Sequence, residues 1–209
     1  MTGKAARKQP QQARSRVTVT AILDATTRIL DREGSDAATT TRISEVAGIS
    51  IGTLYQYFSH RDAILDALQD REFERAMELM ERVLTVGVYG EPRDTAREVV
   101  QGLLKLYAAA PGLHRVLALE GLRVTPTERV KAFDMRVVSV VRSFLAVSKW
   151  PVRRTNLDAA AFVVFQSVRA SMLARMLESP PGVDDESLTE ELTDLIFRYL
   201  IDEAPGSRI

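Results

Sequence analysis

Residues 39–58 read TTTRISEVAGISIGTLYQYF, two short amphipathic patterns separated by a glycine. In both halves apolar residues recur three or four positions apart, as Ile43 does with Ala47 and Leu54 with Phe58. Residues at this spacing share one face of a helix. The intervening glycine suits a tight turn that needs a positive φ. The stretch therefore predicts a helix-turn-helix unit.

Helical patterns flank this unit on both sides. One runs from Arg16 to Glu33, where Gly34 provides a natural stop. Another runs from about Asp62 to Val86. Because two short helices cannot bury their apolar faces alone, we expect these flanking helices to supply the third wall of a small core.

The remainder of the chain also shows helical patterns of apolar residues. The expected helices are Thr95–Ala110, Leu113–Leu122, Thr127–Val147, Leu157–Leu177 and Leu188–Ile201, separated by prolines and glycines, and no segment alternates as a strand would. The predicted fold is all-α with about nine helices: a flexible basic arm (1–15), a three-helix helix-turn-helix domain (16–61), and a second helical domain (62–209).

Composition excludes several classes of protein. The 209 residues include no cysteine and two histidines, so a thiolate metal site and a cysteine nucleophile are excluded and a histidine-based site is poorly supplied. No phosphate-binding loop, Gly-x-Ser-x-Gly or His-Glu-x-x-His motif is present. We expect no enzyme activity, no metal and no cofactor. The longest apolar run, 159–165, is too short for a membrane span, which favours a cytoplasmic protein.

Charge is placed unevenly along a chain of zero net charge. Residues 1–62 hold nine basic and six acidic side chains, and residues 1–16 hold five basic side chains and no acidic one. A basic N-terminus suggests a polyanionic partner at that end. A solubilising tail would have the same composition, so charge alone leaves both interpretations open.

The third predicted helix leaves one face free of core residues. Gly52, Thr53, Gln56 and Tyr57 lie on it. Hydroxyl groups donate to phosphate oxygens, glutamine can read adenine in the major groove, and a glycine lets the backbone approach DNA closely. Arg61 follows at the next helix start and can neutralise a phosphate.

The string 39–58 closely resembles the DNA-binding signature of TetR-family transcription regulators, and the resemblance extends over residues 16–68. It implies phosphate contacts from Thr40, Thr53, Tyr57 and Arg61, and base readout by Thr41, Tyr55 and Gln56. Thr39, Ser50 and Gly52 complete the predicted DNA-binding set. Two positions depart from the family: Arg61 stands where lysine is usual, and Thr40 stands where a branched apolar residue is common.

The resemblance also implies a homodimer, formed through the last two helices. Residues 159–172 are apolar nearly all round, and 188–200 carry a continuous apolar stripe, although both could serve a monomer's core. A ligand pocket is implied in the same region, favouring a mainly hydrophobic effector. The candidate ligand contacts are Tyr107, His114, Leu117, Glu120, Arg123, Trp150, Phe162, Phe165, Gln166 and Arg169.

The predicted function is a sequence-specific DNA-binding regulator. We expect a repressor that leaves a double-stranded operator when a small molecule binds. Two alternatives stay open: an activator of the same family, and a helical ligand-binding or interaction protein without operator binding. The sign of regulation depends on where the operator lies relative to the promoter, which the chain does not encode.

Overall fold

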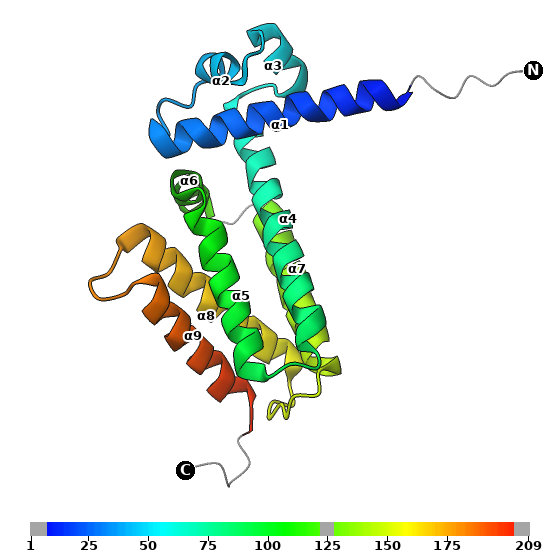
Figure 1. The fold of residues 1–209 in the computed structure, drawn as a ribbon, viewed down its shortest axis with the longest axis vertical. Helices are drawn as coiled ribbons and strands as arrows, with labels where there is room; N and C mark the ends of the chain where they lie inside the picture. Colours follow the sequence, from blue (N-terminus) through cyan, green and yellow to red (C-terminus); the bar gives the residue numbers. More distant parts are fainter. Residues whose placement is uncertain (1–7, 122–127, 203–209) are drawn as a thin grey trace, which may run out of the picture. The chain divides into compact units, whose positions relative to one another are not determined.

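The computed structural model describes residues 8–121 and 128–202, with side chains for 14–119 and 128–202. These residues form helices throughout (Figure 1). The helices are α1 (Lys8–Arg32), α2 (Thr40–Ala47), α3 (Ile51–Tyr57), α4 (Arg61–Gly87), α5 (Pro92–Ala108), α6 (Pro111–Gly121), α7 (Glu128–Val147), α8 (Leu157–Glu178) and α9 (Asp185–Leu200). Within the described ranges, extended pairing is limited to an isolated bridge between Val152 and Ile201. The predicted all-α fold with about nine helices is confirmed.

The first helix begins earlier than the sequence pattern indicated. α1 starts at Lys8, so the part of the expected flexible arm from 8 to 15 is helical, and residues 1–7 lie outside the described range. Lysine, glutamine, alanine and arginine are good intrinsic helix formers, and Pro10 lies in the first turn, where proline is tolerated. Apolar periodicity detects a helix only where it packs against a core, and this extension lies before that part of α1.

The chain divides into two compact units. The first unit comprises the chain through Arg71 together with Ala110–Leu117, and the second comprises Glu72–Ala109 and the chain from Ala118 onward. The division falls inside α4, after its first turns, whereas the sequence suggested a boundary at 61–62. It falls there because the start of α4 contributes Ile64, Leu65 and Leu68 to the core of the first unit.

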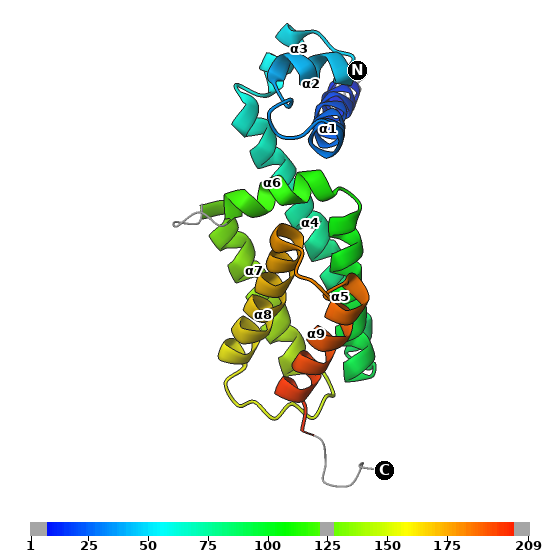
Figure 2. The same ribbon diagram turned by 90° about the vertical axis from the view of Figure 1, so that its left-hand side faces the viewer.

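The core of the first unit explains its three-helix arrangement. α2 packs against both α1 and α3 (Figure 2). Ile22 and Ile29 of α1, Ile43 of α2 and Leu54 of α3 are at most 1% exposed. Full burial of such side chains is worth about 1.5–3 kcal/mol each. The short helices α2 and α3 therefore owe their positions to this shared core.

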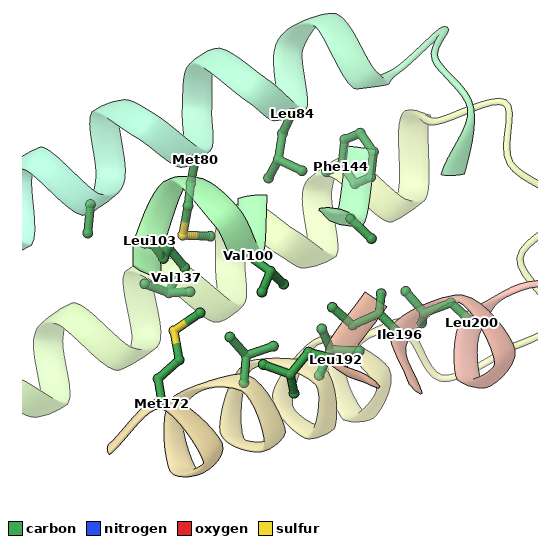
Figure 3. Packing of buried hydrophobic residues seen from close by; sticks show 14 of the residues in the cluster. Met80, Leu84, Val100, Leu103, Val137, Phe144, Met172, Leu192, Ile196 and Leu200 are labelled. Carbon is green, nitrogen blue, oxygen red and sulfur yellow. The ribbon is translucent and has the colours of Figure 1, made fainter. Parts of the chain in front are cut away.

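The second unit is a bundle in which α5 pairs with α9 and α7 pairs with α8 (Figure 2). Figure 3 shows side chains of this unit directed into one interior, among them Met80 of α4, Leu103 of α5, Val137 of α7 and Met172 of α8. All four side chains are buried. The apolar faces of α5, α7, α8 and α9 thus share one core with the second part of α4, whereas Ala110 and Leu113 join the core of the first unit.

α8 buries only one of its faces. Ala160, Val164 and Val168 pack into the core, whereas Phe162 is 53% and Val163 39% exposed. Among the described residues it is also the one helix that is long and apolar enough to cross a membrane, by length and composition. A core helix of a bundle passes the same test, and the buried face shows that α8 serves as one.

Candidate DNA interface

The turn between α2 and α3 is set by local hydrogen bonds. Thr39 Oγ1 accepts from the Arg42 N–H at 3.2 Å and caps the start of α2. Gly48 ends α2 at φ 70°, and its N–H donates to the Glu45 carbonyl at 3.1 Å. Ser50 Oγ then accepts from the Thr53 N–H at 3.0 Å and starts α3. These short-range hydrogen bonds fix where α2 ends and α3 begins.

α3 divides its residues sharply between core and solvent. Leu54 is fully buried and Phe58, which ends the helix, is 9% exposed. Tyr55 is 51% and Tyr57 36% exposed. Gly52 and Gln56 also lie in solvent. The face predicted to read DNA is accessible, with Thr53 partly buried, because the core takes the opposite face.

Two of the predicted contact residues are linked to each other. Thr40 Oγ1 and the Tyr55 hydroxyl oxygen lie 3.2 Å apart and share a hydrogen bond between α2 and α3. A branched apolar side chain at Thr40 could not make this bond, so the departure from the family pattern has a structural consequence here. Thr53 Oγ1 lies 2.8 Å from Ser50 Oγ, and Thr41 is exposed.

Arg61 has a structural role that the sequence did not suggest. Its Nε donates to the Ala38 carbonyl at 3.0 Å, and its Nη2 donates to the Ser35 carbonyl at 3.1 Å and to Ser35 Oγ at 2.8 Å. These bonds fix the segment that leads into α2. The third nitrogen, Nη1, lies 3.8 Å from Asp62 Oδ1 and makes a looser contact. Arg61 thus braces the unit, and a phosphate contact would use Nη1.

Arg42 is held by acids and does not belong to the DNA-reading set. Its Nη2 lies 2.9 Å from Glu33 Oε1 and its Nη1 3.4 Å from Glu45 Oε2. The hydrogen bond from Arg42 lowers the pKa of the Glu33 carboxyl. The Arg42–Glu33 ion pair ties the end of α1 to α2.

The predicted ligand contacts are divided between the two units. His114 and Leu117 belong to the first unit, where the His114 ring Nδ1 lies 2.9 Å from the Ala110 carbonyl oxygen. Trp150 donates to the Gly90 carbonyl at 3.2 Å, and Phe162 is on the exposed face of α8. The Glu120 side chain and Arg123 lie outside the described residues. The sequence did not predict this division, because helical periodicity shows which face of a helix is buried but not which core that face joins.

Tyr107, Phe165, Gln166 and Arg169 do share the second unit, and all four are partly buried. Burial raises the pKa of the Tyr107 hydroxyl. Arg169 Nη1 lies 2.7 Å from Asp134 Oδ2. Asp134 is not among the residues predicted from the sequence, although an acid in the middle of a largely apolar expected helix is a signal that could have identified it.

Groups of three or more potential metal ligands do not occur among the residues that the structure describes.

Two family models match the chain. "Bacterial regulatory proteins, tetR family" matches residues 22–68, which include α2 and α3. "Tetracyclin repressor-like, C-terminal domain" matches residues 92–200, more than half of the chain. The first match coincides with the helix-turn-helix unit and the second with most of the helical bundle.

Individual relatives agree with these matches. The transcriptional repressor KstR of Mycolicibacterium smegmatis is 36% identical over 66 residues, which is 32% of this chain and 32% of KstR. The match thus spans about a third of that relative's length. A Rhodococcus transcriptional regulator superimposes with a TM-score of 0.70 at 16% identity, over 89% of this chain and 99% of its own. FadR of Thermus thermophilus, a repressor solved with lauroyl-CoA, gives 0.64 at 21% identity, over 91% and 100%. At these identities the two structures show a shared fold.

Proposed function

Because the chain belongs to the TetR family of transcriptional regulators, we propose that it represses its target genes by binding an operator through α3, and that a small molecule bound in the second unit releases it. The observation that carries the DNA-binding part is the division of α3 into a buried and an accessible face. The family consists of DNA-binding regulators, in line with the expectation of a non-enzymatic protein. We place the protein in the cytoplasm, where its operator would lie.

Each exposed residue of α3 has a distinct role in this proposal. Gln56 reads a base edge, because its amide can donate and accept together. Tyr57 and Thr53 donate hydroxyl protons to phosphate oxygens. Tyr55 is positioned by its hydrogen bond with Thr40. Gly52 lets the helix backbone come close to the DNA.

The proposed operator complex contains a homodimer. One recognition helix covers too few base pairs for operator affinity, and two-fold dimers read paired half-sites. Phe162 and Val163 of α8 and Leu195 of α9 are between 39% and 53% exposed, which is unusual for large apolar side chains on neighbouring helices. A second copy of the chain would cover them.

Release by a ligand draws support from relatives. KstR is named a repressor, and FadR is a repressor solved with lauroyl-CoA. α4 contributes residues to both units, so a ligand that shifts its second part can affect the first. Release requires that the ligand bind the released conformation more tightly than the DNA-bound one.

The test is a titration of the purified protein with DNA fragments from around its own coding region at fixed salt. We expect saturable, salt-sensitive binding to one fragment. Gln56→Ala should reduce discrimination between that fragment and bulk DNA, and Tyr57→Phe should weaken binding. Tyr89→Phe is the matched control, because Tyr89 is an exposed tyrosine in the second unit. Equal binding by all variants would show that α3 is not the reading surface.

The same fragment placed upstream of a reporter gene decides the sign of regulation. Lower expression with the protein present supports repression. Higher expression would show that the protein is an activator, and the proposed DNA interface would still hold.

A further inference from the structure

Four buried or partly buried polar side chains of the apolar second unit come from four different helices: Glu72 (α4), Tyr107 (α5), Asp134 (α7) and Arg169 (α8). Arg169 Nη1 lies 2.7 Å from Asp134 Oδ2, which joins α8 to α7. Burial raises the pKa of the Tyr107 hydroxyl, and the charges of Arg169 and Glu72 act on it more weakly and in opposite directions. We call these four residues the interior polar cluster.

The cluster is withdrawn from solvent. The Glu72 side chain is 5% exposed, and those of Asp134 and Arg169 are 21% and 24% exposed. Burial raises the pKa of Asp134 more than the neighbouring Arg169 lowers it. Apolar residues follow one turn along the same helices, since Val137 and Met172 lie three positions after Asp134 and Arg169 (Figure 3). Polar groups in such surroundings normally have every hydrogen bond made.

One acceptor of the cluster lacks a partner. Asp134 Oδ1 exposes less than 1 Å² and receives no hydrogen bond, although Oδ2 of the same carboxylate is held by Arg169. The ion pair fixes the carboxylate, so Oδ1 cannot turn to solvent without breaking it. A buried carboxylate oxygen without a donor is unfavourable, and it marks the place where a bound molecule can supply one.

The charges limit what that molecule can be. Arg169 balances Asp134, and Arg75 Nη1, 3.0 Å from Glu72 Oε1, balances Glu72. A carboxylate or phosphate headgroup would face Asp134 with like charge. An ammonium would add an uncompensated positive charge beside Arg169. A hydroxyl group can donate a hydrogen bond to Asp134 Oδ1 and leaves the net charge of the site unchanged.

We propose that the effector is an uncharged, mainly apolar molecule whose hydroxyl group donates a hydrogen bond to Asp134 Oδ1. Its apolar body contacts the core side chains beside the cluster, and Arg169 acts as a positioning residue that aims the carboxylate. This inference rests on the proposed function, because it names the ligand class for the second unit. The proposed ligand class differs from the ligand in the FadR structure, which is an acyl-CoA.

The test compares probes that share one ten-carbon chain: 1-decanol, its methyl ether, decanoate and decylamine, each below its micelle concentration. Binding is followed by calorimetry and by thermal shift on the full-length protein. We expect 1-decanol to bind about tenfold more tightly than the ether, which keeps the oxygen and lacks the donor. Decanoate and decylamine should bind more weakly than 1-decanol.

Variants locate the effect. Asp134→Leu with Arg169→Leu removes the pair without leaving one charge unpaired, and should abolish the preference for the alcohol over the ether. The control is Arg142→Leu with Asp158→Leu, which removes another α7–α8 ion pair, 3.0 Å long and more exposed, and should keep the preference.

Equal binding of alcohol and ether, tighter binding of a charged probe, or no binding of 1-decanol would each overturn the proposal. Operator binding is measured in parallel, so that failure of the proposed ligand class can be distinguished from failure of the proposed function. If the protein binds its operator and decanoate releases it, the proposed function stands and the proposed ligand class is wrong. If the protein binds 1-decanol through Asp134 but binds no operator, the proposed ligand site stands and the proposed function is wrong.

Discussion

Replacing Gly52 by alanine should change stability and DNA affinity in opposite directions. A Cβ at Gly52 would meet only Ser50 Oγ, at 3.8 Å, which is ordinary van der Waals contact. The backbone there is helical, so alanine fits without strain. Alanine is favoured over glycine in helices by about 0.5–1 kcal/mol. We therefore expect the free energy of unfolding to rise by about that amount, measured by urea denaturation.

The same methyl group lies on the exposed face of α3. If that face meets DNA, the helix has to withdraw, and hydrogen bonds from Thr53 or Tyr57 to phosphates lengthen. A hydrogen bond to a charged group is worth about 1.5–3 kcal/mol. Losing one weakens operator binding by about tenfold or more, because each 1.4 kcal/mol is roughly a factor of ten. The dissociation constant is measured by fluorescence anisotropy with a labelled operator.

Gly48→Ala is the comparison for this experiment. Gly48 has φ 70° and no atom within 4 Å of a Cβ, so alanine adds backbone strain of about 1–2 kcal/mol and no clash. It should lower stability, the reverse of Gly52→Ala. If Gly52→Ala loses stability and affinity together, the DNA effect is a folding effect. If its affinity is unchanged, α3 does not approach DNA through Gly52, and the reasoning is refuted.

Three further predictions concern other parts of the molecule. Arg61→Ala should lower the free energy of unfolding by about 1–3 kcal/mol, because buried carbonyl acceptors lose a donor; weaker DNA binding at unchanged stability would show that Arg61 acts only on phosphate. Phe162→Asp should convert dimers to monomers in light scattering and weaken operator binding, and an unchanged dimer would place the interface elsewhere. Hydrogen bonds from Ser187 lower the pKa of Asp184 below its ordinary value of 3.8, so this cap stabilises α9 at neutral pH and loses its effect as pH falls through the lowered value. Asp184→Ala should therefore lower the melting temperature at pH 7, with a difference that shrinks toward pH 3, and a difference independent of pH would contradict the role of the charge.

Helix positions could be predicted well because their signals are local. Gly48 forms the turn that the sequence pattern predicted, and the caps on either side of it, Thr39 and Ser50, are of residue types that favour helix starts. The burial of Leu54 and Phe58 followed from their spacing alone. The start of α1 could not be predicted in this way, since helix formers without an apolar stripe leave no periodic signal.

The sequence by itself determined the helical class, the helix-turn-helix unit and the exposed face of α3, because each depends on residues within a few positions of one another. Only the tertiary structure decided which distant groups meet. It showed that Arg61 holds the segment from Ser35 to Ala38, and that Asp134 meets Arg169. Such contacts join residues 23–35 positions apart, and their geometry depends on how helices pack, which helical periodicity does not specify.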